Sequence, residues 1–253
     1  MKYTFMKNLL FFLFTITSTS LFSQNSSSNE ALEVLKKVDK NMFSETQIVT
    51  SEMIVYGKRK SRTIRSKGYS EGEFKNFTEY LYPDREKGTK MLKLDDRLWI
   101  YSPSTDRIIQ LSGHLLRQSV MGSDLSYEDM MEERKLSEIY FCNILSEEVY
   151  KDRPVWKMEL IAKNDNVSYF RRIVLIDKLQ FVPLESELYA KSGELLKKTV
   201  FSEIKKIEGK WYPTKMNYKD VLKDGKGTDF LILDVIFNKK IPDSYFLKAS
   251  LKK

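Results

Sequence analysis

Cysteine and histidine are almost absent from this chain, which has one of each, Cys142 and His114. A single cysteine cannot form an intramolecular disulfide or a Cys-x-x-Cys redox pair, and one histidine cannot build a histidine-rich zinc site. Glycine and proline are also scarce, at 10 and 6 of 253 residues, which excludes collagen-like and low-complexity chains. Of all residues in the chain, 42% are hydrophobic and 31% are charged, which is typical of a folded protein with a sizeable core. We expect neither a metal nor a cofactor.

Residues 1–23 have the pattern of a cleaved secretory signal peptide. Lys2 and Lys7 precede an apolar run over residues 9–14, and small polar residues follow. The run is far shorter than the ~18 apolar residues that a membrane-spanning helix needs. We therefore expect export, with a mature N-terminus between Ser20 and Asn25.

The exported chain is expected to be moderately basic and free of a lipid anchor. No cysteine lies near the cleavage region. Removing residues 1–23 takes away two lysines and no acid, so the net charge falls from +8 to +6. Because an exported protein rarely meets nucleic acid, this balance favours an anionic membrane surface or an acidic partner.

The start of the mature chain predicts a tether and one helix. Residues 24–29 are polar and read as a tether. Ser27 and Glu30 have the spacing of a capping box, and apolar residues then recur at helical spacing. They predict an amphipathic helix over about 28–42 that packs on a sheet: Ala31, Leu32, Leu35, Val38 and Met42.

From residue 46 onward the hydrophobic period is two, which predicts antiparallel strands that are wet on one side. Residues 90–94 and 98–101 flank an Asp95-Asp96 turn and read as a hairpin. Turn signals separate the later strands: Lys178-Leu179, Ser192-Gly193, Glu208-Gly209 and Asp224-Gly225. We expect about ten or eleven strands in one domain over residues 30–253, because no linker or repeat divides it.

The segment 112–134 lacks strand alternation and predicts a loop-helix cover. Ser126 is placed to cap a short helix over 127–132, with Asp129 where the helix dipole favours a carboxylate. Its methionines suit a surface that accepts variable apolar shapes. A permanent plug of the barrel end remains an alternative to a mobile lid.

Catalysis finds little support in the residue inventory. Ser123-His114-Asp124 and Cys142-His114 are conceivable constellations, but Ser123 lacks the Gly-x-Ser-x-Gly context of a nucleophile elbow. Cys142 stands among apolar residues and reads as a small core residue. A basic run either forms a solvated face or attracts anionic head groups: Lys58, Arg59, Lys60, Arg62, Arg65 and Lys67. We expect no enzyme.

Several motifs resemble the LolA-like family of outer-membrane lipoprotein-sorting proteins. They include Trp99-Ile-Tyr-Ser-Pro103, Gly209-Lys-Trp-Tyr-Pro213 and, as the most specific, Ser119-Val-Met-Gly-Ser-Asp-Leu-Ser-Tyr-Glu-Asp129. The resemblance covers about residues 30–253. It implies a mainly β fold: an incomplete, strongly curved antiparallel β-barrel with helices covering its open side and an apolar cavity for acyl chains.

The resemblance also implies where ligand and family-specific residues lie. The candidates for the cavity and its lid are Trp99, Tyr101, Ile109, Leu111, Leu115, Leu116, Met121, Leu125, Trp156, Met158 and Leu160. The family motif comprises Met121, Gly122, Ser123, Asp124, Ser126, Tyr127, Glu128 and Asp129. No arginine matches the family's lid arginine; Arg107 and Arg117 are nearby basic candidates.

The leading hypothesis from the sequence is a non-enzymatic periplasmic carrier of acyl chains of lipoproteins or other lipids. It is expected to be a monomer that works with an inner-membrane transporter and an outer-membrane acceptor, and not with nucleic acid. The alternative is a ligand-free interaction module of an envelope transport complex. Lipid extraction from the purified protein separates the two.

Overall fold

The computed structural model describes residues 20–57, 59–132 and 134–252. It contains a single 13-stranded antiparallel sheet, in the order β6-β5-β4-β3-β2-β1-β13-β12-β11-β10-β9-β8-β7. Most of the expected signal peptide, residues 1–19, lies outside the described residues.

The strands of the first half of the sheet are β1 Thr46–Tyr56, β2 Ser61–Glu71, β3 Lys75–Tyr82, β4 Lys90–Leu94, β5 Arg97–Ser102 and β6 Arg107–Leu111. Those of the second half are β7 Tyr140–Tyr150, β8 Arg153–Ala162, β9 Arg171–Asp177, β10 Pro183–Tyr189, β11 Leu195–Ile207, β12 Lys210–Asp220 and β13 Thr228–Phe237. The predicted Asp95-Asp96 hairpin and the four later turns lie where expected.

Strand pairing explains why the sheet stays open. Within each half, strands that are consecutive in sequence pair with each other, and the pairing of β1 with β13 joins the two halves. The edge strands β6 and β7 are therefore consecutive in the chain but lie at opposite ends of the sheet. The connection between them must therefore cross the open side of the curved sheet. This open sheet is the incomplete barrel that the family resemblance implies.

The strand count exceeds the expected ten or eleven. Strand β2 is almost entirely polar and β6 has five residues, so neither carries much apolar alternation. Both are nevertheless held by backbone ladders to their neighbours, with one irregularity between Arg65 and Ser66 on the β3 side of β2. Backbone pairing supplied by adjacent strands overrides the weak side-chain signal.

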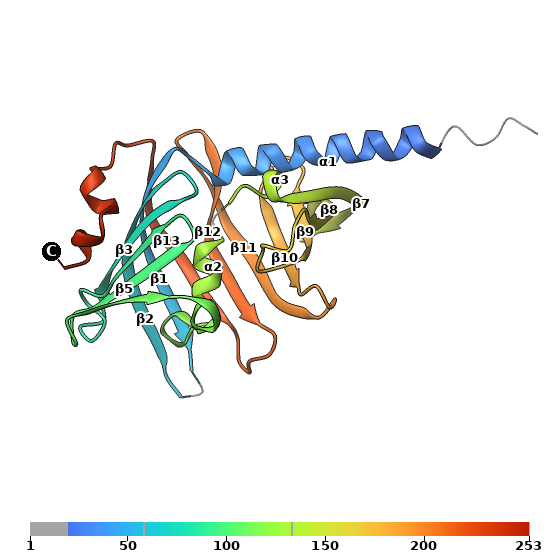
Figure 1. Cartoon of the computed structure of the whole chain (residues 1–253). Helices are drawn as coiled ribbons and strands as arrows, with labels where there is room; N and C mark the ends of the chain where they lie inside the picture. Colours follow the sequence, from blue (N-terminus) through green and yellow to red (C-terminus); the bar gives the residue numbers. More distant parts are fainter. Residues whose placement is uncertain (1–19, 58, 133, 253) are drawn as a thin grey trace, which may run out of the picture.

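Helix α1, Ser20–Met42, lies along one end of the second half of the sheet, and its N-terminal turns extend beyond the sheet (Figure 1). It begins about eight residues before the expected start, so the predicted tether over 24–29 belongs to the helix. No glycine or proline interrupts this stretch, and the low helix propensity of serine and asparagine is a weak constraint.

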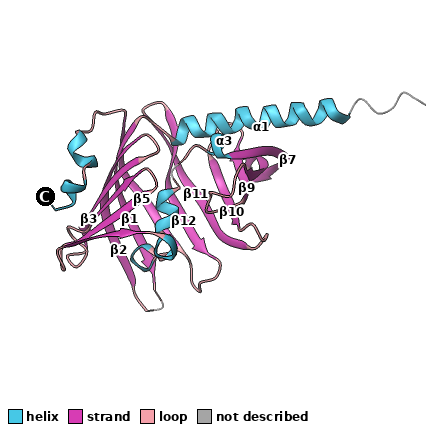
Figure 2. Ribbon diagram, in the orientation of Figure 1, coloured by secondary structure: helices cyan, strands magenta, loops and turns pink. Residues whose placement is uncertain are grey.

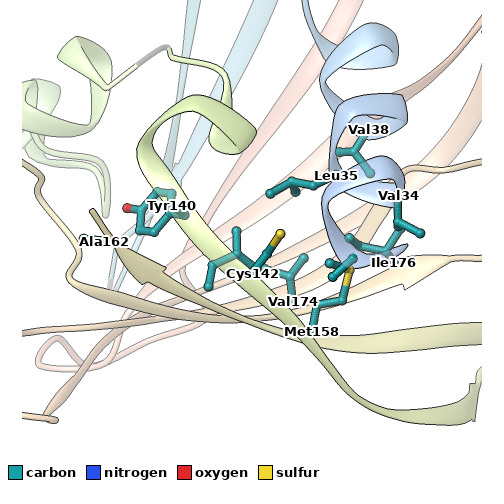
Figure 3. Packing of buried hydrophobic residues seen from close by; sticks show 11 residues of the cluster. Val34, Leu35, Val38, Tyr140, Cys142, Met158, Ala162, Val174 and Ile176 are labelled. Carbon is teal, nitrogen blue, oxygen red and sulfur yellow. The ribbon is translucent and has the colours of Figure 1, made fainter. Parts of the chain in front are cut away.

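The apolar stripe of α1 packs against the sheet, as the sequence predicts. Ala31, Val34, Leu35 and Val38 are buried among residues of β7, β8 and β9 (Figure 3): Tyr140, Cys142, Met158, Leu160, Ala162, Val174 and Ile176. At ~25 cal/mol per Å² of apolar surface, this burial is the main force that docks the helix.

The connection from β6 to β7 holds the 3₁₀ helices η1 Gly113–Arg117 and η2 Val120–Gly122 and the α-helices α2 Tyr127–Met131 and α3 Leu136–Ile139. Figure 2 shows α2 in front of the sheet, between its two halves. We call residues 112–134 the cover.

The C-terminal turns η3 Asp243–Phe246 and η4 Lys248–Lys252 pack on the opposite, outer face of β3–β5. Their buried Phe246 and Leu251 contact a cluster that includes Phe77, Leu92 and Trp99. This cluster marks the outer face of the first half of the sheet, while Met91 and Leu98 belong to the inner face under the cover.

Candidate ligand cavity

The inner face of the sheet encloses a cavity of about 400 Å³. This lies within the ~300–1,000 Å³ typical of small-molecule sites. Apolar residues from both halves of the sheet form most of its wall: Val49, Met53, Ile64, Tyr80, Val174, Ile176, Leu188, Phe201, Tyr212, Met216, Tyr218, Phe230 and Ile232. Because successive residues of a strand point to opposite faces, a curved sheet concentrates one alternate set on this inner side.

Small residues on neighbouring strands leave room inside the cavity. Ser51 on β1 and Ser66 on β2 line it, and their hydroxyl oxygens lie 3.0 Å apart. Gly68 and Ser70 continue the same inward row of β2. The small, mostly polar side chains of β2 therefore leave space in the cavity that larger side chains would fill.

The cover contributes part of the cavity wall through Val120, Leu125 and Met130. Helix α2 begins with the predicted Ser126 cap, which the structure extends to a capping box with Asp129. The Ser126 hydroxyl accepts a hydrogen bond from the amide of Asp129, and the Asp129 carboxylate accepts one of 2.6 Å from the amide of Ser126. The expected cap thus fixes both the helix start and the orientation of Asp129.

The motif residues before α2 anchor the cover to the β12–β13 hairpin. The buried Asp124 carboxylate accepts hydrogen bonds from the Thr228 hydroxyl and the Asp220 amide. Lys223 donates to the Ser119 hydroxyl and to the carbonyl of Ser123. These contacts give Ser119, Ser123 and Asp124 of the motif a role in anchoring the cover.

A second anchor comes from the first half of the sheet. Arg62 on β2 donates a hydrogen bond of 2.8 Å from Nη2 to the carbonyl oxygen of Met121. Met121 has a φ of 49° and Gly122 one of 71°. A Cβ on Gly122 would lie 3.0 Å from Arg62 Nη2, so this turn and the arginine fit closely. Arg107 and Arg117, the candidates named from sequence, are exposed.

Two ion pairs and a tyrosine lie together in the cavity wall, and we call this group the charged end of the cavity. Asp129 of α2 pairs with Lys197 of β11 and accepts a hydrogen bond from the Tyr169 hydroxyl. Glu132, at the end of α2, pairs with Arg172 of β9 at 3.3 Å. All five residues line the cavity, and the side chains of the two pairs are between 6% and 15% exposed.

Two tyrosines near these pairs are held in their neutral form. Burial and the Asp129 carboxylate raise the pKa of Tyr169 far above its ordinary value. Burial likewise raises the pKa of Tyr140 to about 12. The Tyr140 hydroxyl donates to the carbonyl of Tyr169 at 2.7 Å and accepts from Arg172 Nε at 2.9 Å. Tyr140 therefore fixes the orientation of the Arg172 guanidinium.

Of the cavity and lid residues named from sequence, Leu125 lines the cavity. Leu111, Leu116 and Met121 pack into the apolar cluster beneath the cover. Leu115 lies in η1 and is half-buried, and Ile109 is 51% exposed on the edge strand β6.

The remaining candidates lie away from the open part of the cavity. Trp99 and Tyr101 belong to the outer cluster under the C-terminal turns, and their neighbours Leu98 and Ile100 occupy the inner face. Successive residues of a strand point to opposite faces, so the motif that contains Trp99 and Tyr101 does not by itself show which of its residues face the cavity. Met158 and Leu160 are buried beneath α1, with Trp156 packed at the margin of that cluster.

Sequence reasoning missed the charged end of the cavity. It named Asp129 as a motif residue and Tyr169 only as part of the family resemblance, and it gave no role to Arg172 or Lys197. A signal exists at Lys197, which precedes Thr199 and Phe201 on the inward row of β11. A lysine in such a row departs from the apolar alternation. Its partner is 68 residues away, so the pair emerges only from the fold.

Of the four residues in the conceivable catalytic constellations, His114 is exposed and the other three are engaged in packing. The Ser123 hydroxyl is buried and hydrogen-bonds to the backbone of Leu125, and Asp124 binds Thr228. Cys142 lies beneath α1, and burial raises the pKa of its thiol. Within residues 20–57, 59–132 and 134–252, no group of three or more His, Cys, Asp or Glu side chains is placed to hold a metal ion. In the same part of the chain, no helix combines the length and apolarity needed to cross a membrane.

Comparison with known proteins places this geometry in a family. A family model described as "-like: Uncharacterized protein" matches residues 72–253, and the chain belongs to that family. A crystal structure described as an outer membrane lipoprotein-sorting protein domain from Vibrio parahaemolyticus is similar, with a TM-score of 0.75 and 26% identity. The match covers 89% of this chain and 100% of that one. A comparison with curated proteins finds no significant match.

Two further crystal structures share the fold. A DUF1329 family protein from Desulfovibrio piger ATCC 29098 has a TM-score of 0.80 at 24% identity, covering 89% of this chain and 99% of that one. A LolA superfamily protein from Nitrosomonas europaea has a TM-score of 0.74 at 24% identity, covering 87% and 98%. The resemblance to LolA-like outer membrane lipoprotein-sorting proteins that the sequence predicts is confirmed.

Proposed function

We propose that the protein is a non-enzymatic periplasmic carrier that shields the acyl chains of a lipoprotein or another lipid inside the curved sheet. The observation that carries this proposal is the 400 Å³ cavity whose wall is mainly apolar and whose open side is crossed by the cover. Burial of an acyl chain at ~25 cal/mol per Å² supplies affinity without any covalent step. The similarity to an outer membrane lipoprotein-sorting protein domain supports the same role.

A carrier needs a donor and an acceptor. We propose that the chain acts as a monomer between an inner-membrane transporter and an outer-membrane acceptor, after removal of its signal peptide. Shielding in a cavity suits this step because acyl chains are insoluble in the aqueous space between two membranes. Copurified lipid from protein expressed in its own periplasm identifies the cargo.

Uptake of a fluorescent fatty acid tests the cavity directly. Ser66→Trp places a large ring in the cavity and is expected to reduce uptake at least tenfold. Lys67→Trp, the next residue on the opposite face of β2, is the matched control and should bind as the unmodified protein does. Equal uptake by both variants, with the folded state intact by circular dichroism, contradicts binding in this cavity.

Introducing a negative charge on the inner side of the cover tests whether the cover acts as a lid. Leu116→Asp or Met121→Asp should abolish uptake while folding survives, because both side chains pack into the apolar cluster that the cover closes. Gln118→Asp, on the exposed side of the same segment, serves as control. If the Leu116 and Met121 variants unfold, or if uptake persists, the segment is a permanent plug rather than a lid.

The ligand-free interaction module is the second candidate from the sequence. Absence of bound lipid and of fatty-acid uptake in the unmodified protein would favour it. His114→Ala should leave uptake unchanged under either reading, because His114 is exposed on η1 and is not among the cavity-lining residues.

A further inference from the structure

The charged end of the cavity divides its charges between two parts of the molecule. The cations Lys197 and Arg172 belong to strands of the sheet, and the Tyr169 hydroxyl stands two residues before β9. The carboxylates Asp129 and Glu132 belong to the cover. Every ion pair here therefore joins the cover to the second half of the sheet.

These pairs are a costly way to fix the cover. Removing two opposite charges from water costs several kcal/mol per ion, and their attraction often only balances that loss. Apolar side chains would hold the cover equally well. The Glu132 pair is also incomplete, since its Oε2 is buried without a hydrogen-bond partner among the described residues. Arginine binds a carboxylate best through two parallel hydrogen bonds, which this single 3.3 Å contact does not provide.

Movement of the cover away from the sheet affects the carboxylates of the cover and the cations of the sheet differently. Asp129 keeps its local hydrogen bonds to Ser126, which belongs to the same helix turn, and gains water. Lys197, Arg172 and the Tyr169 hydroxyl stay on the sheet, where their carboxylate partners are lost. Two cations and a phenol hydroxyl then lie together in the cavity wall without a carboxylate partner. Because buried charges are costly unless they are paired, this arrangement favours binding of an anion.

The trough continues from these cations in a definite direction. Lys197, Thr199 and Phe201 lie on one inward row of β11, and each step of two residues advances about 6.6 Å along the strand. Met216 on the neighbouring β12 pairs with Phe201 and lines the same wall. An apolar chain anchored at Lys197 therefore passes Thr199 and reaches the apolar side chains of Phe201 and Met216.

We propose that Lys197, Arg172 and Tyr169 form a head-group subsite for an anionic amphiphile, with Asp129 and Glu132 of the closed cover occupying the place of its carboxylate or phosphate. This inference rests on the proposed function, because it assigns the polar end of the same cavity. The ligand anion replaces the carboxylates on the sheet cations, and its tail enters the apolar trough.

Competition between palmitate and hexadecanol, which share a chain length and differ in charge, tests the subsite. Each ligand displaces a neutral fluorescent acyl probe at pH 7.5. A charge-assisted hydrogen bond is stronger than a neutral one, so the unmodified protein should prefer palmitate at least about tenfold. Lys197→Met should lose this preference and keep its affinity for hexadecanol. Lys198→Met, on the other face of β11 and paired with Glu187, should retain the preference.

A variant with the opposite effect guards against loss of folding. Asp129→Asn removes the competing carboxylate but leaves a carbonyl for the Ser126 cap, so palmitate should bind several-fold tighter relative to hexadecanol. Lysophosphatidic acid distinguishes a lipid phosphate from a free fatty acid as the preferred anion. Equal binding of palmitate and hexadecanol by the unmodified protein, or an unchanged preference in Lys197→Met, overturns the subsite and leaves the carrier function standing. Binding of neither ligand nor probe overturns both.

Discussion

The Asp124 carboxylate accepts a hydrogen bond of 2.8 Å from the hydroxyl of Thr228, and the Thr228 oxygen in turn accepts one of 3.0 Å from the Asp124 amide. Both residues are buried, and they lie 104 positions apart. The pair pins the middle of the cover to the first residue of β13, which lies next to β1 at the junction of the two halves of the sheet. Movement of the cover is therefore confined to the parts on either side of this anchor.

Thr228→Val should loosen this anchor. The substitution keeps the shape of the side chain but leaves a buried carboxylate and amide short of a partner, which costs ~1–3 kcal/mol. We expect a free energy of unfolding lower by that amount and faster amide hydrogen exchange over residues 119–125. Thr63→Val, at a half-buried threonine of β2, is the control and should change both quantities little. Unchanged exchange in Thr228→Val contradicts the anchoring role.

Arg62→Ala should release the other side of the cover at little cost to the fold. Arg62 is exposed, so loss of its 2.8 Å hydrogen bond to the Met121 carbonyl should lower the free energy of unfolding by less than ~1 kcal/mol. Amide exchange in η2 should nevertheless accelerate. Arg59→Ala, exposed near the tip of the same hairpin, provides the comparison. Equal exchange in the two variants would show that Arg62 does not restrain the cover.

The sequence predicts the sheet, the docked helix and the cover because each depends on local pattern. Strand alternation and the Ser126-Asp129 cap are readable over a few residues, and both agree with the structure. The absence of alternation over 112–134 identified the cover. Its crossing of the open side follows from the pairing of β1 with β13, which no local pattern encodes.

The cavity wall was harder to predict because it depends on which face of each strand points inward. Trp99 and Leu98 are both apolar and both buried, so only the curvature of the sheet and the position of the C-terminal turns separate them. The charged end was harder still. It joins Asp129, Tyr169 and Lys197 from three separate segments, and each looks like an ordinary polar residue by itself.

The packing of α1 should show a pH dependence through Asp39. Burial raises the pKa of this carboxyl, although its oxygens accept hydrogen bonds from the amides of Leu136 and Ser137. The folded state thus holds the proton more tightly than the unfolded chain does, so the contribution of Asp39 to stability falls as pH rises from about 4 through the folded pKa.

Asp39→Asn removes this titration. The free energy of unfolding of the variant, measured in urea relative to the unmodified protein, should shift in favour of the variant between pH 4 and pH 7. Comparing the two pH values cancels the hydrogen bond that asparagine loses at Ser137. A difference that is independent of pH, or one that shifts the other way, would show that Asp39 titrates normally in the folded state.

Cys142 reports whether α1 stays docked. Its side chain is 5% exposed beneath Leu35 and Val38, and burial raises the pKa of its thiol, so alkylation in the folded protein should be slow even at pH 8. Leu35→Ala leaves a cavity in this cluster and should lower the free energy of unfolding by ~2–5 kcal/mol. Alkylation should then be at least tenfold faster, because the helix undocks more often. Lys36→Ala, on the exposed side of the same turn, should leave the rate unchanged. Fast alkylation of the unmodified protein would mean that α1 leaves the sheet without a substitution, and that residues of the cavity wall such as Val38 and Met42 are only transiently in place.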